Sequence, residues 1–222
     1  MPEFTIEFGA GATPPEDGRL DAAAFHRNHE AIASVIEPAL RGPSGNVLEI
    51  GSGTGQHAVA FAQKLPGIVW WPTDLNEKHL RSIAAWRAHT NTLNVRPPVS
   101  LDASAADWRL GELGLPGTFI AIFCANVIHI APWAVTEGLF AGAGRHLASG
   151  GRLFLYGPFK RDGQHNAPSN AAFDESLRSQ NPEWGVRDVA ELRALAGRNG
   201  LRLIELSEMP SNNAILAFER QS

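Results

Sequence analysis

The sequence predicts an α/β fold, in which a mostly parallel sheet of seven strands carries helices on both faces and one strand runs antiparallel. Three observations predict it. Short apolar runs typical of buried strands alternate with segments of helical periodicity. A glycine-rich loop follows the first apolar run and precedes a helix. The last two apolar runs are joined too tightly for a crossover, so we expect them to pair antiparallel.

The first half of the chain supplies three of the strands. A first helix runs to about residue 40, with Asp21 as its expected cap and one face formed by Phe25, His29, Ile32 and Ile36. Strands and helices then alternate along the chain: strand 46–50, helix 56–65, strand 68–72 leading to Asp74, helix 76–89, and strand 99–101 leading to Asp102.

The second half supplies four more strands and an insertion. Asp188 and Glu191 form a capping-box-like start for its last helix. In chain order we expect strand 118–126, helix 132–147, strand 152–156, an insertion at 157–186 with a short helix near 173–177, a helix from 188 to 199, and strands 201–207 and 214–219.

Size and composition suit one domain rather than two. The chain has 222 residues. We expect a flexible N-terminal arm at 1–20 and a single domain at 21–222, in which 157–186 forms a lid-like insertion. A net charge of −4 argues against partners held by bulk charge, such as nucleic acid or an anionic membrane. No signal sequence or membrane-spanning run is recognised, so we expect a cytoplasmic location.

The glycine-rich loop, Val47-Leu-Glu-Ile-Gly-Ser-Gly-Thr-Gly55, is the strongest chemical signal. Its glycines allow close approach to a ligand, and Asp74 after the second strand can accept hydrogen bonds from ribose hydroxyls. An acid two residues before the first glycine is typical of class I S-adenosylmethionine-dependent methyltransferases. A dinucleotide frame starting at Gly53 also fits, so an NAD-dependent oxidoreductase stays an alternative.

The ends of the other parallel strands complete a predicted cofactor site, because ligands of open α/β sheets bind outside those ends. Asp102 is placed to face an adenine, and Trp108 could cover the adenine ring. The full predicted set of cofactor-binding residues is Glu49, Gly51, Ser52, Gly53, Thr54, Gly55, Asp74, Leu75, Asp102, Ala103, Trp108 and Asn126.

A second cluster follows the fourth and fifth strands, where a methyl acceptor would meet the cofactor. His129 could act as a base near neutral pH, and Tyr156 is a second candidate catalytic residue. Cys124 lies inside an apolar run and is expected to be inert. No spacing of His, Asp, Glu or Cys indicates a metal site. The predicted substrate-binding residues are Arg27, Asn28, His129, Trp133, Asn170, Trp184 and Asn212, with Asn166 and Asn213 nearby.

Motifs distributed over residues 25–213 resemble those of a known family. The most specific are Gly51–Ala58, Asn126-Val-Ile-His-Ile-Ala-Pro-Trp133 and Tyr156-Gly-Pro-Phe-Lys160. Together they resemble domain-of-unknown-function family 938, in its methyltransferase-like protein 26 type. The resemblance implies a Rossmann-like class I methyltransferase fold and S-adenosylmethionine as the cofactor, and it names no substrate. Two positions depart from the family pattern, Ala31 and Cys124, and neither lies in the glycine loop.

The function that these observations favour is methyl transfer from S-adenosylmethionine to a small-molecule acceptor by direct in-line displacement. The enzyme would act mainly by positioning the reactants and excluding water. A non-catalytic module that binds S-adenosylmethionine or S-adenosylhomocysteine is the principal alternative, and the NAD-dependent oxidoreductase is a weaker one.

Overall fold

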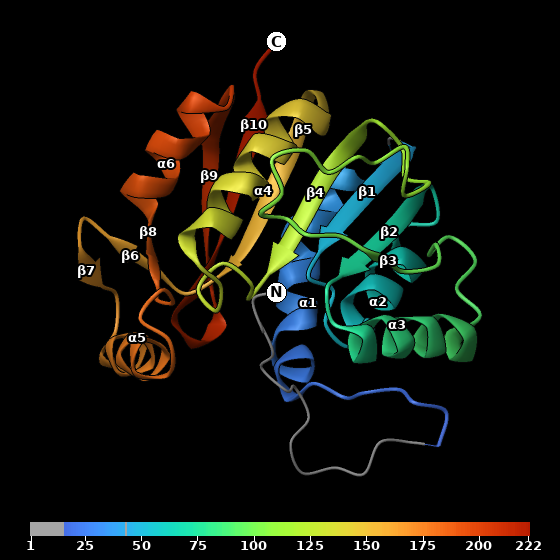
Figure 1. Ribbon diagram of the computed structural model, residues 1–222, viewed down its shortest axis with the longest axis horizontal. Helices are drawn as coiled ribbons and strands as arrows, with labels where there is room; N and C mark the ends of the chain where they lie inside the picture. The colour runs from blue at the N-terminus through green and yellow to red at the C-terminus, as the bar shows by residue number, and fades with distance from the viewer. Residues whose placement is uncertain (1–15, 43) are drawn as a thin grey trace.

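The computed structural model describes residues 16–42 and 44–222. The predicted arm at 1–20 lies mostly outside this range, so its flexibility stays a prediction. Seven strands form one sheet in the order β3-β2-β1-β4-β5-β10-β9, with helices on both faces (Figure 1). Strand β10 is antiparallel to both of its neighbours, and the other pairings are parallel. The predicted mostly parallel sheet with one antiparallel strand is therefore confirmed.

The strands and helices of the large sheet follow the predicted alternation closely. Its strands are β1 (Gly45–Ile50), β2 (Ile68–Asp74), β3 (Val99–Ser100), β4 (Phe119–Ala125), β5 (Leu147–Gly157), β9 (Leu201–Met209) and β10 (Asn213–Arg220). Its helices are α1 (Ala23–Leu40), α2 (Gln56–Lys64), α3 (Glu77–Thr90), α4 (Trp133–His146) and α6 (Val189–Arg198).

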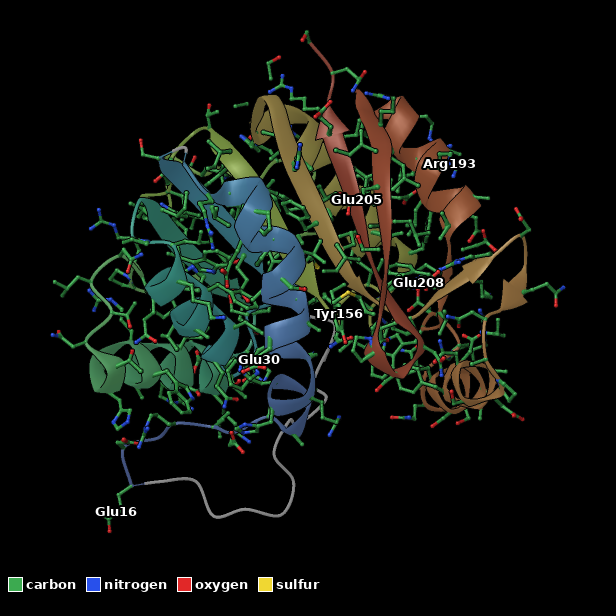
Figure 2. The ribbon with its side chains drawn as sticks, turned by 180° about the vertical axis from the view of Figure 1, so that it is seen from behind. Glu16, Glu30, Tyr156, Arg193, Glu205 and Glu208 are labelled. Carbon is green, nitrogen blue, oxygen red and sulfur yellow. The ribbon has the colours of Figure 1, made fainter. Side chains whose placement is uncertain are left out.

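Alternation along the strands divides the core into two layers. Val47 of β1 packs with Ile36 of α1 and Phe61 of α2, whereas Leu48 packs on the opposite face with Leu139 of α4 and α6 side chains. Figures 1 and 2 show α4 and α6 on one face and α1 on the other. Both faces of the central strands are thus buried, which explains why those strands are continuous apolar runs.

The insertion at 157–186 is more structured than the sequence predicts. The short helix expected near 173–177 is the longer α5 (Pro168–Gln180). Strands β6 (Phe159–Arg161), β7 (Gln164–His165) and β8 (Arg187–Asp188) form a separate three-stranded sheet. These strands are too short to leave a periodic pattern in the sequence. Figure 1 shows α5 beyond the end of the large sheet at which β4 and β5 finish.

One predicted cap is wrong. Helix α1 begins after Ala22, and no side chain of residues 16–42 or 44–222 caps its start. The Asp21 carboxylate instead accepts a hydrogen bond from Gln56 Nε2 at 2.7 Å and bonds to His26 Nε2 at the same distance. Gln56 Oε1 in turn accepts from the backbone N–H of Ala22. Asp21 therefore ties the start of α1 to the start of α2, and this contact stands in place of the cap.

Candidate functional site

Two adjoining pockets lie at the carboxyl ends of the parallel strands. The first, here the glycine-loop pocket, is lined by Gly51 and Gly53 together with residues that follow β2, β3 and β4. The second, here the Arg27 pocket, is lined by α1, α5, the end of β5 and the β9–β10 connection. Asn126 and Ile130 line both pockets. The two spaces therefore meet at the residues that follow β4.

Backbone conformation shapes the glycine loop. Gly51, Gly53 and Gly55 all have positive φ, which glycine adopts at little cost. A Cβ on Gly51 would lie 2.5 Å from Val127 Cγ2, and one on Gly55 would lie 2.7 Å from Ile83 Cα. A Cβ on Gly53 would meet no atom of the described part of the chain within 4 Å. Two glycines thus permit close packing of the loop, and the third leaves open space at the pocket wall.

Asp74 at the end of β2 is fixed in place beside this loop. Its Oδ2 accepts the Gly53 N–H at 2.9 Å, and its Oδ1 accepts the Asn76 N–H at 2.9 Å. The ring of His79 also approaches Asp74, with 3.2 Å between Nδ1 and Oδ1. This carboxylate is nearly buried, and it lines the glycine-loop pocket. It is a positioned hydrogen-bond acceptor for a ligand that carries hydroxyl groups.

Seven of the twelve predicted cofactor residues line the glycine-loop pocket. They are Gly51, Gly53, Asp74, Leu75, Asp102, Ala103 and Asn126. Asp102 folds back to accept hydrogen bonds from the Ser104 N–H and Oγ. Leu75 is 46% exposed, so its side chain offers apolar surface at the pocket wall. The pocket wall therefore offers carboxylates and exposed apolar surface together.

Four further residues of the predicted set stabilise the glycine-rich loop and the strand before it. Ser52 exchanges hydrogen bonds with Thr73 of β2, and Thr54 Oγ1 donates to Gln56. Gly55 forms the N-cap of α2. The buried Glu49 carboxyl accepts the Trp70 indole N–H at 2.6 Å, and burial raises its pKa to about 8. These residues support the pocket and do not line it.

Trp108 does not lie at the pocket. Its ring is buried, stacks on His146 at 5.7 Å between centroids, and covers Gly142 of α4. Its indole N–H donates to the Ala103 carbonyl at 3.3 Å. The expectation that Trp108 covers an adenine is not supported by this placement, because its ring is used within the core.

The Arg27 pocket gathers most of the second predicted cluster. Arg27, Asn28, His129, Tyr156 and Asn170 all line it. Burial lowers the pKa of His129 to about 3, so the imidazole is neutral near pH 7. Burial likewise raises the pKa of Tyr156, which keeps its hydroxyl protonated. The pocket thus presents neutral hydrogen-bonding groups and a single guanidinium.

Three other predicted substrate residues, Asn212, Trp133 and Trp184, are not among the described residues that line this pocket. The Asn212 carbonyl accepts hydrogen bonds from Asn166 Nδ2 and Asn170 Nδ2, which ties α5 to the β9–β10 connection. The Trp133 ring lies 5.5 Å below the guanidinium carbon of Arg187. Trp184 is buried and does not line the pocket. Asn212 is therefore tied to the pocket through Asn170, whereas the structure does not bring Trp133 or Trp184 to the pocket lining.

Several lining residues were missed from the sequence. They include His79 and Val127 in the glycine-loop pocket, and Phe173, Pro210 and Ser211 in the Arg27 pocket. The position of His79 in the first turn of the helix after Asp74 is a signal that could have identified it. Phe173 and Ser211 carry no such signal, because their place depends on how the insertion and the β9–β10 connection fold.

Strained backbone marks the same region. Asn126 has φ of 57°, and Ser211 and Asn212 both have φ of 59°. Such left-handed conformations in residues other than glycine are uncommon and tend to cluster at functional sites. No group of three or more His, Cys, Asp or Glu within residues 16–42 and 44–222 is arranged to hold a metal ion. None of the helices described there is long and apolar enough to cross a membrane.

Comparisons with known proteins agree with this architecture. A family model described as "Protein of unknown function (DUF938)" matches residues 19–220. The pyocyanin biosynthetic protein PhzM is similar at 15% identity and a TM-score of 0.69, over 89% of this chain and 55% of that one.

Two methyltransferase structures are similar as well. An O-methyltransferase family 2 protein from Planctomyces limnophilus, in complex with apigenin, is 19% identical at a TM-score of 0.72, over 87% of this chain and 56% of that one. Human N-acetylserotonin methyltransferase in complex with SAM is 12% identical at a TM-score of 0.72, over 90% of this chain and 53% of that one. This chain spans about half the length of these three structures. The likeness shows a Rossmann-like methyltransferase fold.

Proposed function

This chain belongs to the DUF938 family, and we propose that it is an S-adenosylmethionine-dependent methyltransferase that acts on a small-molecule acceptor. We place it in the methyltransferase-like protein 26 type of that family, on the motifs at 51–58, 126–133 and 156–160. The observation that carries the proposal is the pair of pockets that meet at Asn126 and Ile130. A donor in one and an acceptor in the other would face each other there.

The residues of the glycine-loop pocket fit the cofactor. Open space beside Gly53 lets a ligand lie against the backbone of the loop. The fixed carboxylate of Asp74 can accept from ribose hydroxyls, and Asp102 can accept from an exocyclic amine. The exposed Leu75 side chain supplies apolar contact for a base. S-adenosylmethionine bound there would supply an electrophilic methyl group attached to a sulfonium.

The chain's own contribution to the transfer would be positioning and exclusion of water. The residues of the Arg27 pocket would hold the acceptor with a lone pair directed at the methyl group that S-adenosylmethionine would supply, and the thioether sulfur would be the leaving group. Neutral His129 can accept a hydrogen bond from the acceptor and so orient that lone pair. Any proton released by the acceptor passes to solvent, because an imidazole of such low pKa holds it poorly.

Calorimetric titration with S-adenosylhomocysteine tests the proposal. We expect the wild type to bind it and Asp74→Ala to bind at least tenfold more weakly. Asp107→Ala is the matched control, because Asp107 is exposed and lies outside both pockets. Absence of binding by the wild type, or equal binding by a folded Asp74→Ala protein, would refute the proposal. Tighter binding of NAD would favour the oxidoreductase, and binding without turnover of any acceptor would favour the non-catalytic module.

A further inference from the structure

The Arg27 pocket has a distinctive charge. Among the residues that the structure describes, Arg27 on α1 lines it, and no aspartate, glutamate or lysine does. Within residues 16–42 and 44–222, none of the carboxylates forms an ion pair with the Arg27 guanidinium; the nearby Asp21 is bonded to His26 and Gln56. Because buried His129 is neutral near pH 7, the guanidinium is the only formal charge among the described residues of this wall. The pocket therefore carries one uncompensated positive charge.

A hydrogen-bond donor lies in the same pocket. The Tyr156 hydroxyl oxygen accepts a hydrogen bond from Asn213 Nδ2 at 3.1 Å. A phenol oxygen has two lone pairs and one proton. Since an amide NH₂ group can only donate, Asn213 uses a lone pair of this oxygen, and the O–H can be donated to a ligand. Figure 2 shows Tyr156 at the end of β5 beside α1, the helix that carries Arg27.

The Asn28 amide is itself held in one orientation. Asn28 is buried, and its Oδ1 lies 2.9 Å from His57 Nε2. A carbonyl oxygen can only accept, so His57 donates there and the Asn28 NH₂ group faces Tyr156. His57 is neutral because burial lowers its pKa to about 3. The bond between α2 and α1 thus sets the orientation of the Asn28 amide, whose NH₂ group favours a hydroxyl oxygen, not a hydroxyl proton, at Tyr156.

The two pockets have opposite charge. Asp74 and Asp102 line the glycine-loop pocket, so an anion is repelled from it and attracted to the Arg27 pocket. One guanidinium balances one carboxylate and matches its planar geometry. A phosphate monoester near pH 7 carries a charge of about −1.5 to −2 and would be left partly uncompensated. Phe173, which is 39% exposed and meets His129 edge-on, adds an aromatic wall.

Resting on the proposed function, we propose that the methyl acceptor is a small carboxylate with an apolar or aromatic body. Its carboxylate pairs with the Arg27 guanidinium and accepts the Tyr156 O–H, and its body packs against Phe173. The pairing holds the anionic end at the exposed side of the pocket, where Arg27 lies. The nucleophilic atom then projects toward Asn126 and Ile130, where the two pockets meet.

Ligand-observed NMR with S-adenosylhomocysteine at saturation tests this. The probes are benzoate, phenylacetate and 3-phenylpropionate, each paired with its amide, together with phenyl phosphate. We expect at least one carboxylate to bind tenfold or more tightly than its amide. Arg27→Met should abolish that preference, Arg27→Lys should restore part of it, and Tyr156→Phe should weaken the carboxylate about fivefold.

Arg193→Met is the matched control. Arg193 lies on α6, away from α1 and Tyr156, and removing it changes the net charge equally (Figure 2). It should leave carboxylate binding unchanged. Equal binding of acids and amides, preference for phenyl phosphate, or an unchanged preference in Arg27→Met would overturn the inference. If the wild type still binds S-adenosylhomocysteine when one of these results is obtained, only the inference about the acceptor fails. If the wild type does not bind S-adenosylhomocysteine, the proposed function itself is refuted.

Discussion

Replacement of Gly53 by alanine separates the cofactor site from the stability of the loop. Gly53 has φ of 57°, and a Cβ there would meet no atom within 4 Å. The variant therefore loses only the backbone cost of a left-handed alanine, about 1–2 kcal/mol. The added methyl group projects from a residue that lines the glycine-loop pocket. We expect S-adenosylhomocysteine to bind at least tenfold more weakly, about 1.4 kcal/mol in binding free energy.

Gly114→Ala is the matched control for that experiment. Gly114 has φ of 71°, its Cβ would also meet nothing within 4 Å, and it lies outside the pocket. Urea denaturation should give both variants a similar loss of unfolding free energy, whereas calorimetry should show weak cofactor binding only for Gly53→Ala. If Gly53→Ala binds S-adenosylhomocysteine as tightly as Gly114→Ala does, the placement of the cofactor against this loop is wrong.

Three further predictions concern buried groups, each read from urea denaturation. Because burial raises the pKa of Glu49 from 4.5 to about 8, the folded state keeps a proton that the unfolded state has released between those values, and wild-type stability falls as pH rises through them. Glu49→Gln should lack this loss, so its unfolding free energy should exceed that of the wild type by about 4 kcal/mol at pH 8 but not at pH 4.5; equal pH profiles would contradict it. The pKa of His57 falls from 6.5 to about 3, so stability falls as pH drops through that window, and His57→Gln should reduce the slope by about 1.4 kcal/mol per pH unit. Gly142→Ala would press a methyl group into the Trp108 ring and should destabilise the fold by about 1–3 kcal/mol, whereas Gly197→Ala, with open space around it, should not.

Local patterns were the part of the fold that could be predicted. The β1–loop–α2 unit follows from the apolar run and the glycine spacing, both of which lie within twenty residues. Asp188 was identified as a cap, and its carboxylate accepts the Ala190 N–H at 2.7 Å. Asp21 was also predicted to be a cap, and that prediction failed because its carboxylate bonds to Gln56, which lies 35 residues away along the chain. The residues next to a possible cap do not reveal that a distant side chain will bond to it instead.

The residues of the candidate site also differ in whether local sequence patterns could place them. Residues at strand ends, such as Asp74 and Asn126, could be placed because parallel strands bring their carboxyl ends to one edge. Trp108 could not, since its spacing from Asp102 gives no sign that its ring turns toward Gly142. Phe173 reaches the Arg27 pocket only because α5 is tied to the β9–β10 connection by side-chain bonds to a backbone carbonyl.

A crystal structure with S-adenosylhomocysteine tests the central claim most directly. The account predicts the ribose hydroxyls on the Asp74 carboxylate, the base beside Leu75 and Asp102, and the sulfur near Asn126, facing the Arg27 pocket. A ligand bound outside the glycine-loop pocket would contradict the claim. A sulfur atom turned away from the Arg27 pocket would contradict it equally, because no acceptor held by Arg27 could then reach the methyl group.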